Sequence, residues 1–325
     1  MNVLVTGAGG LIGRAVVKQT RAAGWRVTGA ARRPCAEADL ICDLRRPIEN
    51  LAAPDAVLHL AGGYAGASAR ELADSDLAIA HNVLAWGRRQ GIRRWVLASA
   101  AEVYGSIQGE ADEQAATRPV IPYGEVKLEV ERLFAQMASD VPDCHIVFLR
   151  IGEVYGRDSR LLHELITRLK SGFCPWPGSG RVPLSFVHVD DVALAFQLAT
   201  QLAPAGISVY NVADGEPTTW YSFVRHLGQK IGAHPPVRLP LPLVYSYMLG
   251  HRCASSLAGR TPVLTSYALR LLTTPKVLSS GKIKRELGFS PQFPDFRFGL
   301  EEALHGLSHH PQNGAAQRST PRSLA

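Results

Sequence analysis

The sequence of 325 residues predicts an α/β fold built on a doubly wound parallel sheet. Short apolar runs alternate with stretches of helical periodicity through the first part of the chain. A glycine-rich segment follows the first apolar run directly, and proline-rich segments break the alternation from about residue 156 onward. The expected strands are residues 3–5, 26–30, 55–60, 94–98 and 144–149, and the expected helices are residues 11–23, 72–90 and 123–138.

The segment between the first expected strand and the first helix reads Thr6-Gly7-Ala8-Gly9-Gly10-Leu11-Ile12-Gly13. Gly7 permits a tight turn, Gly10 lets the backbone approach a pyrophosphate, and Gly13 allows close packing of the helix on the strand. The amino end of the helix, at Leu11 and Ile12, favours the negative charge of such a group. The pattern therefore predicts a Rossmann dinucleotide site formed by Gly7, Gly10, Leu11, Ile12 and Gly13.

The end of the second strand indicates which dinucleotide is bound. An NAD site usually places Asp or Glu there to bind the ribose hydroxyls, whereas this chain has Ala30-Ala31-Arg32-Arg33. Because a guanidinium can clamp a 2′-phosphate, Arg32 predicts NADP, with NAD as the alternative; a solvated loop is the other interpretation of the arginines. Asp43 and Leu44, after a third strand, are placed to contact the adenine, and an ordinary turn is the alternative for Asp43.

Tyr123-Gly124-Glu125-Val126-Lys127 is the strongest chemical signal in the chain. A Tyr and a Lys four residues apart lie on the same face of a helix. A phenol is a poor base at neutral pH, and a nearby ammonium favours its ionised form, which brings it toward the range where proton transfer is effective. We therefore predict Tyr123 as an acid–base group and Lys127 as its partner, which also holds the nicotinamide ribose.

The second part of the chain is expected to form a smaller, C-terminal substrate-binding domain. Residues 1–156 are assigned to the Rossmann domain, with residues 184–214 returning to its sheet, and residues 157–183 and 215–307 to the substrate-binding region. Residues 308–325 are polar, lack periodicity and are expected to be a disordered tail. Asp190 or Asp191 is expected to cap a helix over residues 192–199 rather than to bind a metal, and no metal site is predicted. Arg181 is a candidate for binding a substrate phosphate, with a surface position as the alternative.

Composition excludes several classes of protein. The five cysteines form no Cys-x-x-Cys pair, which argues against a disulfide framework and a zinc site. The formal net charge is +7, but the Arg-Arg pairs are dispersed, so an anionic small molecule is favoured over nucleic acid. No apolar run reaches the length of a membrane span, and the first residues read as a strand rather than a signal peptide, so we expect a cytoplasmic protein.

Seven segments in order resemble the extended short-chain dehydrogenases/reductases, the NAD-dependent epimerase/dehydratase family. They are residues 6–13, 59–62, 98–105, 123–127, 149–156, 186–191 and 284–289, so the resemblance covers about the first 300 residues. It implies a single-chain NAD(P) enzyme, often a homodimer, that acts on sugar nucleotides, steroids or related carbinols. It also implies that Leu60, Ala61 and Gly62 line the cofactor and that residues 152–154 lie near the nicotinamide.

The chain departs from the resemblance at one position. The family has a catalytic Ser or Thr four residues before the Tyr of the Val-Tyr-Gly turn, and this chain has Ala100 there. Ser99 is one residue earlier and in a regular strand would point to the other face. We expect a bulge at the strand end to present Ser99 as the third catalytic residue; the alternative is that no local hydroxyl takes part.

The function predicted is hydride transfer between nicotinamide and a secondary alcohol or ketone. Epimerisation or dehydration of a sugar nucleotide by the same residues is the alternative, and a non-catalytic NADP-binding protein is a lesser one. Apolar segments at residues 239–249 and 262–272 favour a hydrophobic substrate, with a core or a dimer face as the other interpretation.

Overall fold

The centre of the protein is a seven-stranded parallel sheet with the strand order β12-β7-β5-β4-β1-β2-β3. It is seen in a computed structural model that describes residues 1–49, 51–63, 68–141, 143–172, 174–246, 248 and 266–308. The sheet confirms the predicted fold class. Its strands are β1 (Asn2–Thr6), β2 (Arg26–Ala31), β3 (Leu40–Ile41), β4 (Ala56–His59), β5 (Arg94–Ala100), β7 (His145–Ile151) and β12 (Gly206–Val212).

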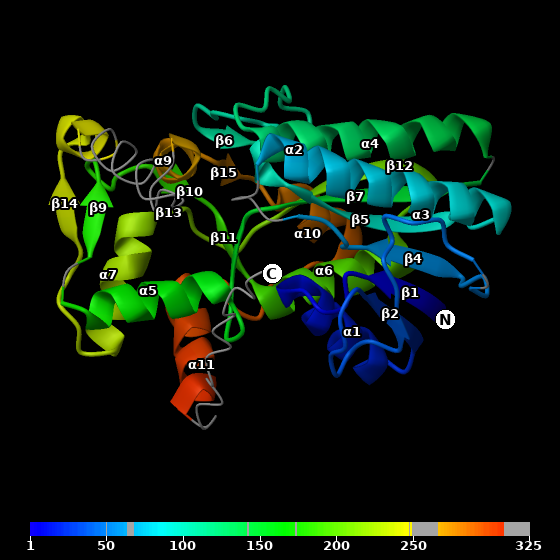
Figure 1. Cartoon of the computed structure of the whole chain (residues 1–325), viewed down its shortest axis with the longest axis horizontal. Coiled ribbons are helices and arrows are strands. Elements are labelled where there is room, and N and C mark those ends of the chain that lie inside the picture. The colour runs from blue at the N-terminus through cyan, green and yellow to red at the C-terminus, as the bar shows by residue number, and fades with distance from the viewer. Residues whose placement is uncertain are drawn as a thin grey trace, which may run out of the picture.

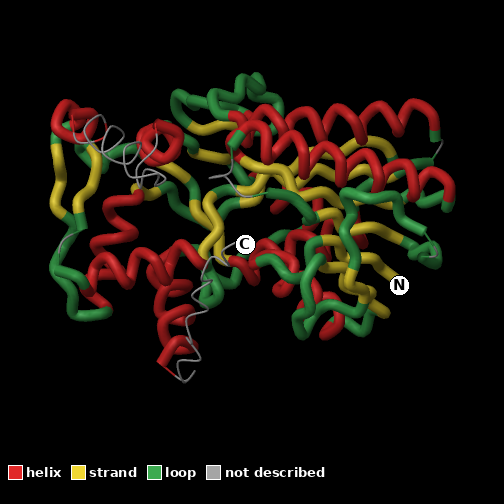
Figure 2. The backbone as a smooth tube through the Cα atoms, viewed as in Figure 1, coloured by secondary structure: helices red, strands yellow, loops and turns green. Residues whose placement is uncertain are grey.

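Helices cover both faces of this sheet (Figures 1 and 2). Buried side chains of one set of helices share an apolar cluster with one face, and those of a second set share another cluster with the opposite face. The first set is α1 (Leu11–Ala22), α6 (Val189–Leu202) and α10 (Gly281–Leu287). The second is α3 (Ala78–Arg89) and α4 (Pro122–Asp140), and the short α2 (Ala69–Leu72) and the π-helical turn η1 (Ala73–Leu77) precede α3 and contact α4. All residues of β4 are buried, as is typical of a strand covered on both faces.

The strand order fixes where ligands bind. β1 pairs with β2 on one side and with β4 on the other, so the order reverses between β1 and β4. In open parallel sheets, ligands occupy the crevice at the carboxyl ends of the strands beside such a reversal. The glycine segment follows β1 at this edge, and α4 begins at the same edge because it precedes β7, with Pro122 at its first position.

Several other elements form a second region, at the left of Figure 1. Its core is rich in aromatic rings, with Phe186 stacked on Phe223 at a centroid distance of 4.5 Å. Its helices are α5 (Arg160–Lys170), α7 (Trp220–Lys230), α9 (Ser266–Thr273) and α11 (Phe296–Ser308). β9 (Pro175–Pro177) pairs with β14 (Val237–Leu239), and β10 (Pro183–Leu184) pairs with β13 (Thr218–Thr219).

Two further strand pairs lie at the carboxyl edge of the sheet. β8 (Glu153–Tyr155) pairs with β11 (Phe186–His188), and β6 (Glu110–Ala111) pairs with β15 (Val277–Leu278). The segment expected to return to the central sheet therefore divides: β12 joins that sheet, whereas β11 pairs with β8 outside it. The predicted tail from residue 309 onward and parts of the two apolar segments, residues 247, 249 and 262–265, lie outside the described residues.

Within the described part of the chain, the helices are all too short or too polar to cross a membrane. The helix expected over residues 72–90 is interrupted in its first turns by η1, a conformation that is rare and often found at functional sites.

Candidate active site

The glycine segment forms a compact turn against the loop that follows β4. Gly7 has a φ of +72°, a conformation that disfavours other residues, and a Cβ there would lie 2.8 Å from the backbone N of Ala61. A Cβ on Gly13 would clash with the carbonyl of Gly7. Gly10 caps α1 without a side-chain hydrogen bond, so the amino end of the helix faces the turn. The turn and the amino end of α1 together form a cradle of the kind that binds a pyrophosphate in Rossmann folds.

Thr6 joins the ends of β1 and β4. Its hydroxyl oxygen lies 2.9 Å from Nδ1 of His59 and accepts hydrogen bonds from the backbone N–H groups of Leu60 and Ala61, at 3.1 and 3.2 Å. Burial, assisted by the positive charge of Lys127, lowers the pKa of His59 to about 3, so the imidazole is neutral at physiological pH. The predicted cofactor residues 60–62 are therefore held beside the glycine turn.

Tyr123 and Lys127 lie on one face of α4, as their spacing predicts. Nζ of Lys127 is 5.5 Å from the centroid of the Tyr123 ring. The same ammonium is 3.4 Å from Oδ2 of Asp76. A Cβ on Gly62 would lie 3.0 Å from Nζ of Lys127. Lys127 thus links the aromatic side chain to the loop after β4.

Asp76 is a member of this site that our sequence interpretation missed. It lies in η1 with 2% of its side chain exposed, and its Oδ1 accepts hydrogen bonds from Gly63 N and Ser75 Oγ at 2.5 and 2.9 Å. A carboxylate this close to Lys127 opposes the effect of the ammonium on the Tyr123 phenol. One signal was available: Leu72, Asp76 and Ala80 are all buried at four-residue spacing, so a charged residue lies on the buried stripe of the helix.

The expected bulge at Ser99 is wrong. β5 and β7 stay in register through the last residue of β5, with Ser99 paired to Arg150 and Ala100 to Ile151. The Ser99 hydroxyl points to the face covered by α4, where it donates a hydrogen bond to Oε1 of Glu131 at 2.5 Å. The hydroxyl is therefore engaged below α4 instead of being presented at the strand end.

Ser99 belongs to a buried polar network that runs across three strands. In the paired strands, Ser99, Arg150 and Asn211 occupy adjacent register positions. The guanidinium of Arg150 donates to both carboxylate oxygens of Glu131, at 3.1 and 2.7 Å, and lies 4.9 Å from the ring centroid of Tyr104. The Tyr104 hydroxyl in turn donates to Oδ1 of Asn211 at 2.8 Å. Since Glu131 is one turn beyond Lys127 on α4, this network anchors the helix that carries the site.

The residues expected at the adenosine end are grouped but more exposed. Arg32 and Arg33 follow β2 and are exposed, while the side chain of Leu44 is buried in the core. Asp43 lies in a turn and accepts hydrogen bonds from Arg45, which hold the pKa of this carboxyl below its usual range. Its contact with the adenine stays a prediction. Arg14 on α1 was not anticipated: its Nε donates to the carbonyl of Gly9 at 3.1 Å.

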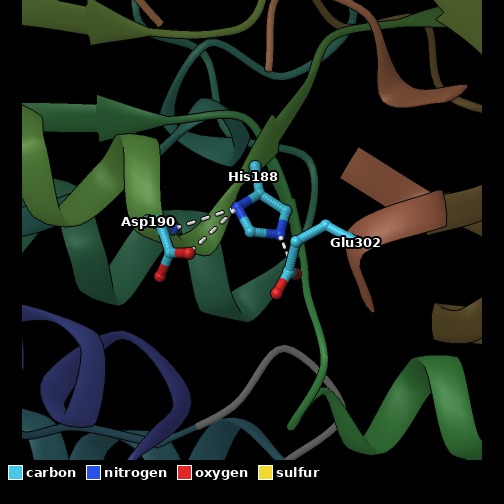
Figure 3. A group of neighbouring side chains, drawn as sticks. All are labelled: His188, Asp190 and Glu302. Carbon is cyan, nitrogen blue, oxygen red and sulfur yellow. Dashed lines mark hydrogen bonds and ion pairs between the residues drawn. The ribbon is translucent and has the colours of Figure 1, made fainter. Parts of the chain in front are cut away.

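The histidine at the start of α6 corrects another prediction. The helix begins at Val189, and its N-cap is His188 rather than Asp190 or Asp191. Figure 3 shows the His188 ring between Asp190 and Glu302. Nδ1 accepts the backbone N–H of Asp190 at 3.3 Å, and Nε2 lies 3.4 Å from Glu302.

These three side chains come close enough together to suggest a metal site, which the sequence did not predict. Burial lowers the pKa of His188, so its ring is neutral at physiological pH. Arg181, the other candidate in this part of the chain, is exposed on the loop between β9 and β10.

The chain is similar to known proteins over most of its length. The sequence model of the NAD dependent epimerase/dehydratase family matches residues 3–213. The chain is 28% identical to the 2-alkyl-3-oxoalkanoate reductase of Stenotrophomonas maltophilia, over 94% of this chain and 98% of the reductase. It is 29% identical to the 3-diazoavenalumate denitrifying reductase of a Streptomyces species, over 92% and 99% of the two chains.

A solved structure agrees with the fold. The UDP-glucose 4-epimerase of Thermus thermophilus, in complex with NAD, superposes with a TM-score of 0.74 at 22% identity, covering 95% of this chain and 99% of the epimerase. The match to the family model spans the glycine turn, Lys127 and the central sheet. The chain therefore belongs to the NAD dependent epimerase/dehydratase family and is an enzyme.

Proposed function

We propose that the protein is an NAD(P)-dependent reductase that converts a ketone to a secondary alcohol, or the reverse, with Tyr123 as the acid–base group. The main support for this proposal is the position of Lys127, whose ammonium lies close to the Tyr123 ring, to Asp76 and to the loop at Gly62. The cradle at Gly7 and Gly13 fits the pyrophosphate of a dinucleotide. When bound, the nicotinamide supplies or accepts the hydride.

In the reducing direction, the phenol of Tyr123 gives its proton to the carbonyl oxygen as the alcohol forms. Lys127 stabilises the phenolate left behind, and Asp76 orients the ammonium so that it lies between the phenol and the loop after β4. The neutral imidazole of His59, behind Lys127, adds no further positive charge. In the oxidising direction, the phenolate takes the same proton back.

Relatives with near-complete coverage favour a reductase over an epimerase. Three of them are named as reductases or a ketoreductase, at 27–29% identity. The resemblance to the UDP-glucose 4-epimerase of Thermus thermophilus is one of fold, at 22% identity. We therefore propose an oxoalkanoate-like or otherwise largely apolar ketone as the substrate class.

The test is to measure the oxidation of NADPH or NADH with a 2-alkyl-3-oxoalkanoate as substrate. We expect turnover in the wild type and a loss of about 10³-fold or more in Tyr123→Phe, with the cofactor Kd unchanged, because only the transferable proton is removed. An enzyme that only epimerises would show no net consumption of cofactor. Retention of most activity by Tyr123→Phe would refute the assignment of Tyr123.

We further propose that NADP(H) is preferred, because Arg32 is exposed directly after β2 where an acidic residue would repel a 2′-phosphate. Arg32→Ala should weaken NADPH binding by about 10-fold and leave NADH binding nearly unchanged. Arg26→Ala, at the exposed other end of the same strand, is the matched control. Equal affinity of the wild type for the two cofactors would contradict the preference.

A further inference from the structure

Two glutamates and a lysine meet at the carboxyl edge of the sheet, beside the start of α4. Glu102 lies in the short helix η2 (Ala101–Val103), which follows β5, and Glu153 opens β8, which follows β7. Because Ala100 and Ile151 are paired, both glutamates leave the sheet at adjacent positions. A Cβ on Gly124 would clash with the carbonyl of Glu102, so η2 packs directly against the turn of α4 that carries Tyr123.

Backbone hydrogen bonds hold Lys276 beside the two glutamates. The N–H of Glu153 donates to the carbonyl of Ser185 at 2.9 Å, and the N–H of Ser185 donates to the carbonyl of Lys276 at 3.0 Å. Lys276 comes from a distant part of the chain, 174 residues after Glu102. The three side chains are thus brought together by the pairing of separate segments rather than by flexible surface contacts.

Lys276 is shared unequally between the two carboxyl groups. Its Nζ is 2.5 Å from Oε1 of Glu102 and 3.9 Å from Oε2 of Glu153. The exposed fractions of the side chains are 5% for Lys276, 11% for Glu102 and 26% for Glu153. Glu153 is therefore both the more weakly paired carboxyl group and the open end of the cluster.

The charges in the cluster do not balance. Two carboxyl groups face one ammonium, and two carboxylates that share a poorly solvated site favour protonation of one of them. Burial raises the pKa of Glu153 to about 7; Lys276 opposes this shift and the charge of Glu102 adds to it. A cavity of about 10 Å³, which is room for about one water molecule, borders Glu102, Lys276 and Arg270. The Arg270 guanidinium donates to the backbone carbonyl of Val120.

We propose that Glu153 is a catalytic residue that, in its protonated form, donates a hydrogen bond to the substrate oxygen, the contact that Ala100 cannot supply. The inference rests on the proposed function. Position 100 carries a methyl group, and the Ser99 hydroxyl is held by Glu131. A neutral carboxylic acid is an effective donor to a developing oxyanion in a site sheltered from water. The proton stays on Glu153, so Tyr123 remains the group that transfers one.

The first test reads the protonation of Glu153 without turnover. Infrared difference spectra from about pH 5 to about pH 9 should contain a carboxylic acid signal that disappears with a midpoint near 7 in the wild type and is absent from Glu153→Gln. Glu216→Gln, at an exposed position, is the matched control and should keep the signal. The buried Asp214, whose pKa burial raises to about 8, should titrate in all three proteins. Identical spectra of wild type and Glu153→Gln would overturn the inference.

The second test uses turnover of a 2-alkyl-3-oxoalkanoate with NADPH. Glu153→Ala should lose about 10²-fold in kcat, whereas Glu153→Gln, which keeps a neutral donor, should stay within about 10-fold of wild type. In the wild type, the rate of reduction should fall as the pH rises through about 7, because Glu153 loses its proton. Glu153→Gln should not show this fall, although Lys276 and Glu102, the charged groups that face position 153, are unchanged.

A rescue variant separates loss of the donor from loss of structure. Ala100→Ser in the Glu153→Ala background should recover about 10-fold in kcat, because it restores a donor at the strand end without restoring the cluster. Wild-type turnover in Glu153→Ala, or an unchanged pH profile in Glu153→Gln, would refute the role of Glu153. Tyr123→Phe tests the proposed function independently, since the infrared titration of Glu153 should persist in that variant.

Discussion

Two buried ionic clusters flank the same sheet edge, and they are built differently. The Glu131–Arg150 pair lies under α4, its oxygens are bridged by the guanidinium and Ser99, and both side chains are less than 10% exposed. The cluster of Glu102, Lys276 and Glu153 lies at the end of the strands, with one carboxyl group more than its ammonium can neutralise. The first cluster is balanced and closed, and the second is unbalanced and open.

The difference separates a structural role from a chemical one. A buried charge is tolerated when a partner and hydrogen bonds satisfy it, and the Glu131–Arg150 pair meets this condition. A surplus carboxyl group avoids the free-energy cost of an unpaired buried charge by taking up a proton. Its pKa is therefore raised toward neutral pH. Breaking the balanced cluster should therefore change stability, whereas changing the unbalanced one should change the response to pH.

The largest expected effect is on the balanced cluster. Arg150→Met should lower the free energy of unfolding by about 3–5 kcal/mol, because Glu131 is left buried without its partner. Arg132→Met is the control on the outer side of α4, where the pair with Glu129 is exposed, and it should change stability by less than about 0.5 kcal/mol. Denaturant unfolding measures both. Equal effects of the two substitutions would remove the distinction between the clusters.

The unbalanced cluster should appear in the pH dependence of stability. The pKa of Glu153 in the folded protein, about 7, is raised above its unfolded value, so its contribution is fully present below about pH 4. That contribution is lost as the pH rises through 7, because the unfolded chain then releases the proton more readily. Asp214, with a pKa raised by burial to about 8, changes stability in the same direction.

The measurement is the free energy of unfolding from about pH 5 to about pH 8, compared between wild type and Glu153→Gln. The variant should lose about 1–2 kcal/mol less than wild type over this range, a figure reduced for the partial exposure of Glu153. The contribution of Asp214 is common to both proteins and cancels in the comparison. Parallel curves for the two proteins would mean that Glu153 does not titrate in this range.

The parts of the site that could be predicted from sequence are those encoded by local spacing. The glycine turn follows a strand within a few residues, and the four-residue spacing of Tyr123 and Lys127 places both on one helix face. The structure confirms the fold class and this shared face. Both depend on backbone geometry that a short segment specifies by itself.

The remaining features depend on contacts between distant segments. Asp76 reaches Lys127 through an irregular turn of helix, and Glu153 acquires its environment from Lys276, far along the chain. The bulge at Ser99 was inferred from a missing hydroxyl, but the register of β5 is set by its pairing with β7 along the whole strand. The cap of α6 was assigned to the aspartates because they are common caps, and His188 takes that position.

The smallest expected effect concerns Ser99. Ser99 contacts the balanced cluster and its neighbour Ala100 lies beside the unbalanced one, so substitutions at the two positions compare the clusters. Ser99→Ala removes the hydrogen bond to Glu131, but Arg150 still binds both oxygens of that carboxylate. We expect a loss of about 1 kcal/mol in the free energy of unfolding and turnover within about 3-fold of wild type. Ala100→Ser, one residue later, should leave stability nearly unchanged and alter kcat more than Ser99→Ala does, because it places a hydroxyl at the strand end beside Glu102 and Glu153. If Ser99→Ala instead lowered turnover by about 10²-fold at unchanged stability, the hydroxyl would belong to the reaction and the division of roles between the two clusters would fail.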